Sequence, residues 1–254
     1  MQRKLPLARP IILLMIISMF LSIQPAKSTS TRTIGVWFWV AADEEWRSWA
    51  LWTMGYLDWT TLAKLYVEYC VSFYFSDAFR IYFNVETVIA YNSDNSLSVD
   101  KDRINDAQSK TGFLSNSEPW NGYIILVAFT GQQITDSSGG LLYGASTAGT
   151  EWWRGIVIVN SGMGWTEYTL QHELSHLYAA QDHWDPVLQC VMNIYIIHVG
   201  LNFIPIALTT HDWCTDCTNT IMSNRERFGQ IGNYGGGGGG KCYPVGNLTG
   251  GLTA

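Results

Sequence analysis

The stretch "HELSHLYAAQDH", residues 172–183, holds three of the five histidines in the chain. On a helix, positions four apart lie on one face with about 5–6 Å between their Cβ atoms, so His172 and His176 can bind one metal ion. Two neutral imidazoles suit Zn²⁺, and zinc lowers the pKa of a bound water to about 7. The intervening Glu173 lies where a carboxylate can accept the proton of that water. The spacing therefore predicts a zinc site with Glu173 as the general base.

A catalytic zinc needs a third protein ligand and keeps one open position. Two candidates follow the histidine pair closely, Asp182 and His183. Residue type and spacing alone leave both of them open.

At this point the sequence resembles a known family. "HELSHLYAAQD" is similar to the metzincin signature HExxHxxGxxH/D, in which the helix stops at a glycine and the chain turns back to offer the third ligand. Ala179 occupies the glycine position and Asp182 the third-ligand position, so the resemblance implies Asp182. A left-handed turn strains a residue with a Cβ by about 1 kcal/mol, and a reshaped turn would bring His183 to the metal instead. The resemblance also implies a Met-turn beneath the zinc, with Met192 in "CVMN" as its packing floor.

The cysteines extend the resemblance to the archaemetzincin subgroup, in which a Cys-x-Met and a distant CxxC help to bind a second, structural zinc. The sequence has Cys190-Val-Met192 and later "CTDC" with Cys214 and Cys217. His183 stands where the first cysteine of that arrangement would be, so the resemblance implies a Cys₃His site. The alternative is a disulfide from Cys190 to Cys214 or Cys217, which an exported protein allows. Of the other cysteines, Cys70 is expected in the core.

The resemblance covers roughly residues 32–229 and implies a zincin/metzincin-like α+β fold. Such a fold has a mixed twisted sheet, an active-site helix and an irregular C-terminal subdomain. Patterning agrees with this order, because Val- and aromatic-rich strand signals interleave with helical ones. The edge of the sheet, where a peptide could pair in extended form, is expected at 140–146 and 154–160. Strands are expected at 32–41, 80–92, 121–131 and 154–160, and helices from residue 59, within 98–114 and over 164–180.

The composition of the 254-residue chain excludes some classes of protein. Hydrophobic residues make up 47% and charged residues 14%, which suits a packed core, and the formal charge of −6 argues against nucleic acid. A basic start, a short apolar run over Ile11–Ile23 and small residues up to Ser28 predict a signal peptide at 1–28 and a secreted protein. An uncleaved membrane anchor is the alternative. The remaining domains are a metzincin-like catalytic domain at 29–229 and a Gly-rich flexible tail at 230–254.

Together these features predict a secreted, monomeric zinc-dependent metalloendopeptidase. It would act on a peptide or protein substrate, with one catalytic zinc and, if the cysteines do not form a disulfide, a second structural zinc. It would not contact a membrane after signal cleavage. Two alternatives are a catalytically inactive zinc-binding or adhesion module and a membrane-anchored protease. The intact Glu173 argues against an inactive module, which has no need of that carboxylate.

Overall fold

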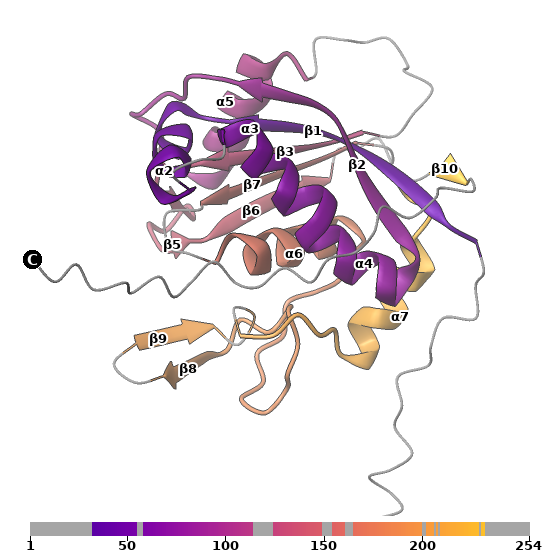
Figure 1. The fold of residues 1–254 in the computed structure, drawn as a ribbon. Helices are drawn as coiled ribbons and strands as arrows, with labels where there is room; N and C mark the ends of the chain where they lie inside the picture. The colour runs from indigo at the N-terminus through magenta and orange to yellow at the C-terminus, as the bar shows by residue number, and fades with distance from the viewer. Residues whose placement is uncertain are drawn as a thin grey trace, which may run out of the picture.

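A mixed, mostly parallel sheet forms the centre of the computed structural model, which describes residues 32–54, 58–113, 124–148, 154–160, 165–199, 202–205, 207, 209–228 and 230–231. β1 pairs with β2 on one side and β3 on the other, followed by β7 and β6 (Figure 1). The mixed sheet and the α+β class were both expected and are confirmed. The parallel strands are β1 (Ile34–Ala42), β2 (Ile81–Ala90), β3 (Ile124–Thr130) and β7 (Arg154–Asn160), and the antiparallel ones are β6 (Gly144–Ala148) and β10 (Gln230–Ile231).

The central strands are apolar throughout because both faces of the sheet are covered. On β3, Val127 and Phe129 belong to the larger core cluster, whereas Leu126 and Ala128 belong to the smaller one on the opposite face. β7 alternates in the same way. The strands expected at 121–131 and 154–160 are therefore present as β3 and β7, and both are buried on both faces.

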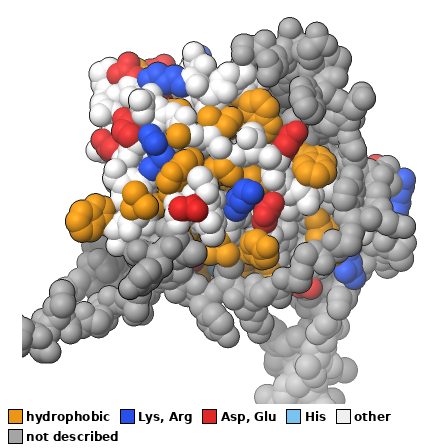
Figure 2. All heavy atoms as spheres, turned by 45° about the horizontal axis from the view of Figure 1, so that its top comes forward, with side chains coloured by type: hydrophobic (Ala, Val, Ile, Leu, Met, Phe, Trp, Pro, Cys, Tyr) orange, Lys and Arg blue, Asp and Glu red, His pale blue; other side chains and the backbone are white. Residues whose placement is uncertain are grey.

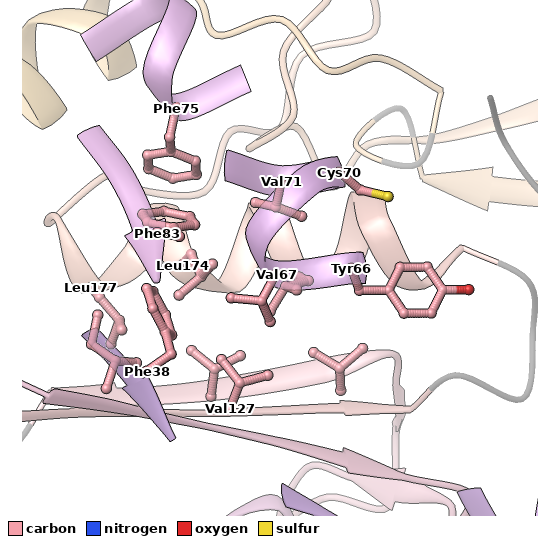
Figure 3. Close-up of a cluster of buried hydrophobic side chains, with 14 of the residues drawn as sticks. Phe38, Tyr66, Val67, Cys70, Val71, Phe75, Phe83, Val127, Leu174 and Leu177 are labelled. Atoms are coloured by element: carbon pink, nitrogen blue, oxygen red, sulfur yellow. The ribbon is translucent and has the colours of Figure 1, made fainter. Parts of the chain in front are cut away.

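The larger core lies between the sheet and a long helical segment together with the histidine-bearing helix α6 (Thr166–Leu177). In Figure 3, Val67 and Val71 of the helical segment, Leu174 of α6 and Val127 of the sheet converge on this core. Helix α5 (Asp100–Thr111) covers the other face through Ile104 and Ala107. The helical segment consists of α3 (Trp59–Lys64), a π-helical part η1 (Leu65–Val71) and α4 (Ser72–Phe79).

Two helical features go beyond the sequence-based expectations. The helix expected from residue 59 continues as a helical segment to Phe79, and Asp58 caps its start by accepting the Thr61 N–H at 2.7 Å. An additional helix, α2 (Glu44–Met54), follows β1 directly. Its first turn is capped by the buried Asp43, which accepts the Trp46 N–H at 2.7 Å.

Beyond α6 the chain is mostly irregular, as expected for the C-terminal subdomain. It contains the hairpin of β8 (Ile196–Val199) and β9 (Asn202–Pro205), which lies on the opposite side of α6 from the sheet (Figure 1), and the helix α7 (Thr215–Asn224), which lies beside α4. β10 pairs with the start of β1, so the sheet includes Gln230 and Ile231, which were expected in the flexible tail. The predicted signal peptide at 1–28 and residues 232–254 of the tail lie outside the described residues.

Within the described part of the chain, every helix is too short or too polar to span a bilayer. The surface that faces the viewer in Figure 2 carries charges of both signs, scattered among hydrophobic side chains. Two short strands, β4 (Ile134–Thr135) and β5 (Leu141–Leu142), form a separate ladder just before the edge strand β6.

Candidate metal centre

Helix α6 places the two histidines of the HExxH stretch on one face, one turn apart. Their Nε2 atoms lie 3.1 Å from each other. The opposite side of α6 is buried in the core through Leu170, Leu174 and Leu177. The helix is therefore held rigidly by its apolar side while it presents His172 and His176 together.

Backbone carbonyls fix the tautomers of both rings. The Nδ1 of His172 lies 2.7 Å from the Val191 carbonyl oxygen, and the Nδ1 of His176 lies 2.9 Å from that of Ala180. A carbonyl oxygen can only accept, so in each neutral ring the proton sits on Nδ1 and the Nε2 lone pair is free. Two lone pairs that face each other at 3.1 Å repel unless a cation lies between them. Metal-binding histidines have this outer-shell arrangement.

Asp182 completes a three-residue cluster with this pair. Its Oδ1 lies 3.3 Å from the Nε2 atoms of both His172 and His176. The chain reaches this position through a left-handed residue, Ala179, with φ of 68°. The turn is therefore not reshaped by the missing glycine, and it brings Asp182, not His183, to the histidine pair.

The separations suit tetrahedral zinc. With Zn–N and Zn–O bonds of about 2.0–2.1 Å, tetrahedral ligand atoms lie about 3.3 Å apart. The observed separations are 3.1 and 3.3 Å. Side-chain exposures of 12% for His172, 26% for His176 and 44% for Asp182 show that the cluster is reachable from one side. His172, His176 and Asp182 therefore fit a zinc that keeps one open position.

The electrostatic environment of this cluster favours positive charge. Burial disfavours the charged form of His172, but the hydrogen bond to Asp182, the charge of Glu173 and the Val191 carbonyl outweigh it and raise the pKa of His172 to about 9. Burial raises the pKa of Asp182, yet its hydrogen bonds to the two histidines dominate and hold it well below the usual range. A site that stabilises the added proton in this way also stabilises a metal cation.

Glu173, a residue of helix α6, lies on the side of the helix that contacts strand β6. Its carboxyl side chain is buried against β6, where a Cβ on Gly144 would meet the Glu173 Cγ at 2.8 Å and Oε1 at 3.1 Å. Among the described strands β6 pairs only with β7, so its other side is the edge of the described sheet. Of the two segments expected at the edge, 140–146 includes the start of this strand, which touches the predicted general base. The other, 154–160, is the interior strand β7 between β3 and β6, so that part of the expectation is wrong.

A second cluster forms around the residue next to Asp182. The Nε2 of His183 lies 3.0 Å from the Sγ of Cys217 and 3.3 Å from that of Cys214, and Cys190 completes a group whose ligand atoms all lie within 4.8 Å of one another. All three cysteines are free thiols in the structure. The expected disulfide between Cys190 and Cys214 or Cys217 is therefore not formed, and the Cys₃His arrangement is.

The thiol cluster favours at least one thiolate. A hydrogen bond from Cys217 lowers the pKa of Cys190 to about 5, and the backbone N–H groups of Cys214 and Met192 add to this against the effect of burial. In turn, the neighbouring Cys190 raises the pKa of Cys217. The donor set of one imidazole and three sulfur atoms is typical of structural zinc sites, which use four protein ligands.

Comparison with solved structures finds weak similarity in overall fold to proteins of low sequence identity. The crystal structure of archaemetzincin from Methanopyrus kandleri is 10% identical over 76% of this chain and 96% of its own, with a TM-score of 0.45. Metalloproteinase-II from Bacteroides fragilis is 14% identical over 82% of this chain and 60% of its own, with a TM-score of 0.44. No family model and no curated protein matches the sequence. Function is therefore inferred from the geometry of the site.

The structure brings together His172, His176 and Asp182 in one group and His183, Cys190, Cys214 and Cys217 in another; their binding of metal stays a prediction. Met192 is fully buried directly after Val191, whose carbonyl holds His172. Its role as the packing floor of a Met-turn stays a prediction. The carbonyls of Val191 and Ala180 were not foreseen, because a backbone acceptor leaves no signal in the residue type.

Two polar residues on the buried side of α6 were also missed. Gln171 and Ser175 each precede a site histidine by one position and are fully buried. Polar residues at buried helix positions are the signal that could have found them, since such groups require partners. Cys70, expected in the core, is buried and also disulfide-bonded.

Proposed function

We propose that this protein is a secreted zinc-dependent metalloendopeptidase. One observation carries the proposal: two imidazole Nε2 lone pairs and a carboxylate oxygen converge within 3.1–3.3 Å while both Nδ1 atoms are already committed to carbonyls. His172, His176 and Asp182 would hold the zinc. When bound there, zinc supplies polarisation of a peptide carbonyl and activation of a water.

The residues of this chain would perform the proton transfers. Glu173 follows the ligand His172 directly, so its carboxylate is tethered beside the metal position. It would accept a proton from the attacking water and deliver that proton to the leaving amine, a role that typically contributes about 10²–10⁴-fold to the rate. Because Glu173 rests against Gly144, the edge strand limits the directions in which its carboxylate can swing.

The substrate would bind in extended form along β6. An exposed sheet edge offers unpaired N–H and C=O groups to a peptide, and this pairing gives affinity largely independent of side chains. β6 runs beside α6 and reaches Glu173 at Gly144. A peptide paired with this edge would therefore pass the general base. This supports cleavage within a chain rather than the recognition of a small molecule.

The second cluster would hold a structural zinc. His183, Cys190, Cys214 and Cys217 supply four ligands, so this ion would have no open position for a substrate. Export to an oxidising compartment is supported by the N-terminal sequence and by the disulfide at Cys70. Thiols that bind zinc are protected there from pairing with one another.

Replacing Glu173 with Gln tests the proposal. The variant should keep its zinc, because Glu173 is not a ligand, and lose about 10²–10⁴-fold in kcat for a fluorogenic peptide. Zinc per chain is measured by elemental analysis alongside the rate. Glu167→Gln, on the same helix but outside the cluster, is the matched control and should retain activity.

Proteolysis undiminished in Glu173→Gln would rule the assignment out. Chelator-sensitive cleavage of casein by the wild-type protein separates an enzyme from an inactive zinc-binding module. The mass of the exported protein separates a secreted form, which lacks residues 1–28, from a membrane-anchored one.

A further inference from the structure

We propose that the thiol cluster positions the ligands of the histidine–aspartate cluster, so that metal binding at one site strengthens metal binding at the other. The thiol cluster comprises His183, Cys190, Cys214 and Cys217, and the histidine–aspartate cluster comprises His172, His176 and Asp182. The inference deepens the proposed function, on which it rests, by assigning a regulation to the same site.

The first link between the clusters is covalent, because Asp182 and His183 are consecutive. His183 is fixed on both sides of its peptide: its N–H donates to the Met192 carbonyl at 2.8 Å, and its own carbonyl accepts the Ile194 N–H at 3.0 Å. When the His183 imidazole is a ligand of the thiol cluster, the preceding residue has little freedom. Asp182 is the most exposed ligand of its cluster, with 44% of its side chain accessible, and it gains most from such a restraint.

The second link is the peptide carbonyl that orients His172. Val191 lies between Cys190, a member of the thiol cluster, and Met192. Its carbonyl accepts the His172 Nδ1–H at 2.7 Å. The Sγ of Cys190 accepts the N–H groups of Met192 at 3.4 Å and Cys214 at 3.3 Å, so the sulfur joins the turn that carries this carbonyl to the segment that supplies the other thiol ligands.

The third link is the segment 211–214, which joins the Val191 turn to helix α6. The Asp212 carbonyl accepts the Val191 N–H at 2.7 Å. On one side of it, His211 and Gln171 exchange two hydrogen bonds of 2.5 and 2.8 Å; on the other, the Trp213 Nε1–H donates to Ser175 Oγ at 2.9 Å.

This segment is held firmly because its anchors are buried. The His211 ring is stacked between Tyr74 and Tyr168, with centroid distances of 3.9 and 4.0 Å. Gln171 and Ser175 are fully buried and precede His172 and His176 by one position each. The segment then delivers Cys214 and Cys217 to the thiol cluster. The same stretch of backbone therefore supports the ligands of one cluster and supplies those of the other.

Loss of the thiol cluster should therefore weaken metal binding by the histidine–aspartate cluster, because the thiol cluster supports the backbone that orients those ligands. Removing the partner that orients a ligating histidine typically weakens metal affinity by about 10–100-fold. Cys217 makes its contacts within the thiol cluster and not with His172, His176 or Asp182 among the interactions of the described residues. An effect of its substitution on the histidine–aspartate cluster must therefore pass through the thiol cluster.

The test variant is Cys214→Ser/Cys217→Ser, compared with Cys217→Asp, which keeps a fourth zinc ligand. Cobalt is the spectroscopic probe, because thiolate ligands give charge-transfer bands that imidazole and carboxylate ligands do not. In the double variant these bands should disappear, and the zinc Kd of the histidine–aspartate cluster, measured by competition with a chromophoric chelator, should rise about 10–100-fold. Cys217→Asp, which keeps a fourth ligand, should leave that Kd close to the wild-type value.

A folded double variant that has lost its thiolate bands but binds zinc at the histidine–aspartate cluster with unchanged Kd would overturn the proposal. Coupling between binding sites is reciprocal, so a second measurement covers the case in which the double variant does not fold. Thiol-cluster zinc should then be bound about 10–100-fold more tightly in the wild-type protein than in His176→Ala, in which the other cluster cannot fill. Equal affinities there would also overturn it. A wild-type protein with coupled metal sites but no peptidase activity would refute the proposed function and leave this inference standing.

Discussion

Two adjacent residues, Asp182 and His183, belong to two different ligand clusters, and the comparison between the clusters separates their chemistry. The histidine–aspartate cluster has three nitrogen and oxygen ligands and is partly exposed, whereas the thiol cluster has four ligands, three of them sulfur, with Cys190 and Cys217 buried. Three ligands leave a position for reactants, and four close the coordination sphere. One peptide bond thus connects a three-ligand cluster, which would leave a metal position open, to a four-ligand cluster, which would not.

The largest effect on zinc binding and activity is expected when a charged ligand is removed from the three-ligand cluster. Asp182→Asn removes the carboxylate charge from the three-ligand cluster and should lower both zinc affinity there and peptide hydrolysis by more than about 10²-fold, since loss of an outer-shell partner alone costs about 10–100-fold. The thiol cluster should keep its zinc. Elemental analysis and a peptide assay check both outcomes.

Asp185→Asn is the matched control for this substitution. Asp185 lies in the same loop, where its Oδ1 accepts the Val187 N–H at 2.9 Å, and it is not a member of either cluster. It should retain wild-type zinc content and activity. Equal losses in the two variants would show that the loop, and not the ligand, is what matters.

A smaller difference between the two clusters is expected in the rate at which a chelator removes zinc from each of them. A chelator should extract zinc in two phases of about one ion each, first from the partly exposed three-ligand cluster and then from the closed four-ligand one. Zinc release is followed with a chromophoric chelator, and thiol reactivity with a disulfide reagent. The free thiols Cys190, Cys214 and Cys217 should become reactive only in the slow phase. Thiol exposure in the fast phase would reverse the assignment of the two sites.

The smallest effect is expected on the free energy of unfolding, from changes in the turn at Ala179 that precedes Asp182 and His183. Ala179→Gly should raise the free energy of unfolding by roughly 0.5–1 kcal/mol, because glycine adopts the φ of 68° without Cβ strain. Ala180→Gly, one position later and without positive φ, should instead lower it by roughly 0.5–1.5 kcal/mol by loss of a buried methyl and added chain entropy. Denaturant unfolding measures both. Destabilisation by Ala179→Gly would contradict the strain at this residue.

The sequence predicted that His172 and His176 would lie together, because the spacing of residues on a helix is fixed by geometry. It could not decide between Asp182 and His183, because that choice depends on whether Ala179 tolerates a left-handed conformation, and the rest of the fold determines this. It also left the cysteines open, since the choice between zinc and a disulfide depends on how His183 approaches them. Strands β3 and β7 were predictable because they are apolar on both faces.

Helix α2 was missed for a different reason. Its capping residue Asp43 directly follows a strand, and its tryptophans give no clear helical periodicity. The π-helical part at Leu65–Val71 has no sequence signal at all, since it is a local accommodation to packing. The polar residues Gln171 and Ser175 occupy buried helix positions, and this signal could have indicated the hydrogen bonds that they make to the segment at 211–213.

The thiol cluster also has a consequence for the unfolded chain. His183 and Cys217 are 34 positions apart, so an ion held by both closes a loop that contains the whole β8–β9 hairpin. A preformed metal site rarely exists in an unfolded chain, so the free energy of binding an ion there would add to the stability of the folded state. A hairpin of two four-residue strands is only marginally stable by itself. A bound ion would therefore tie both ends of the segment that carries the hairpin to the folded molecule.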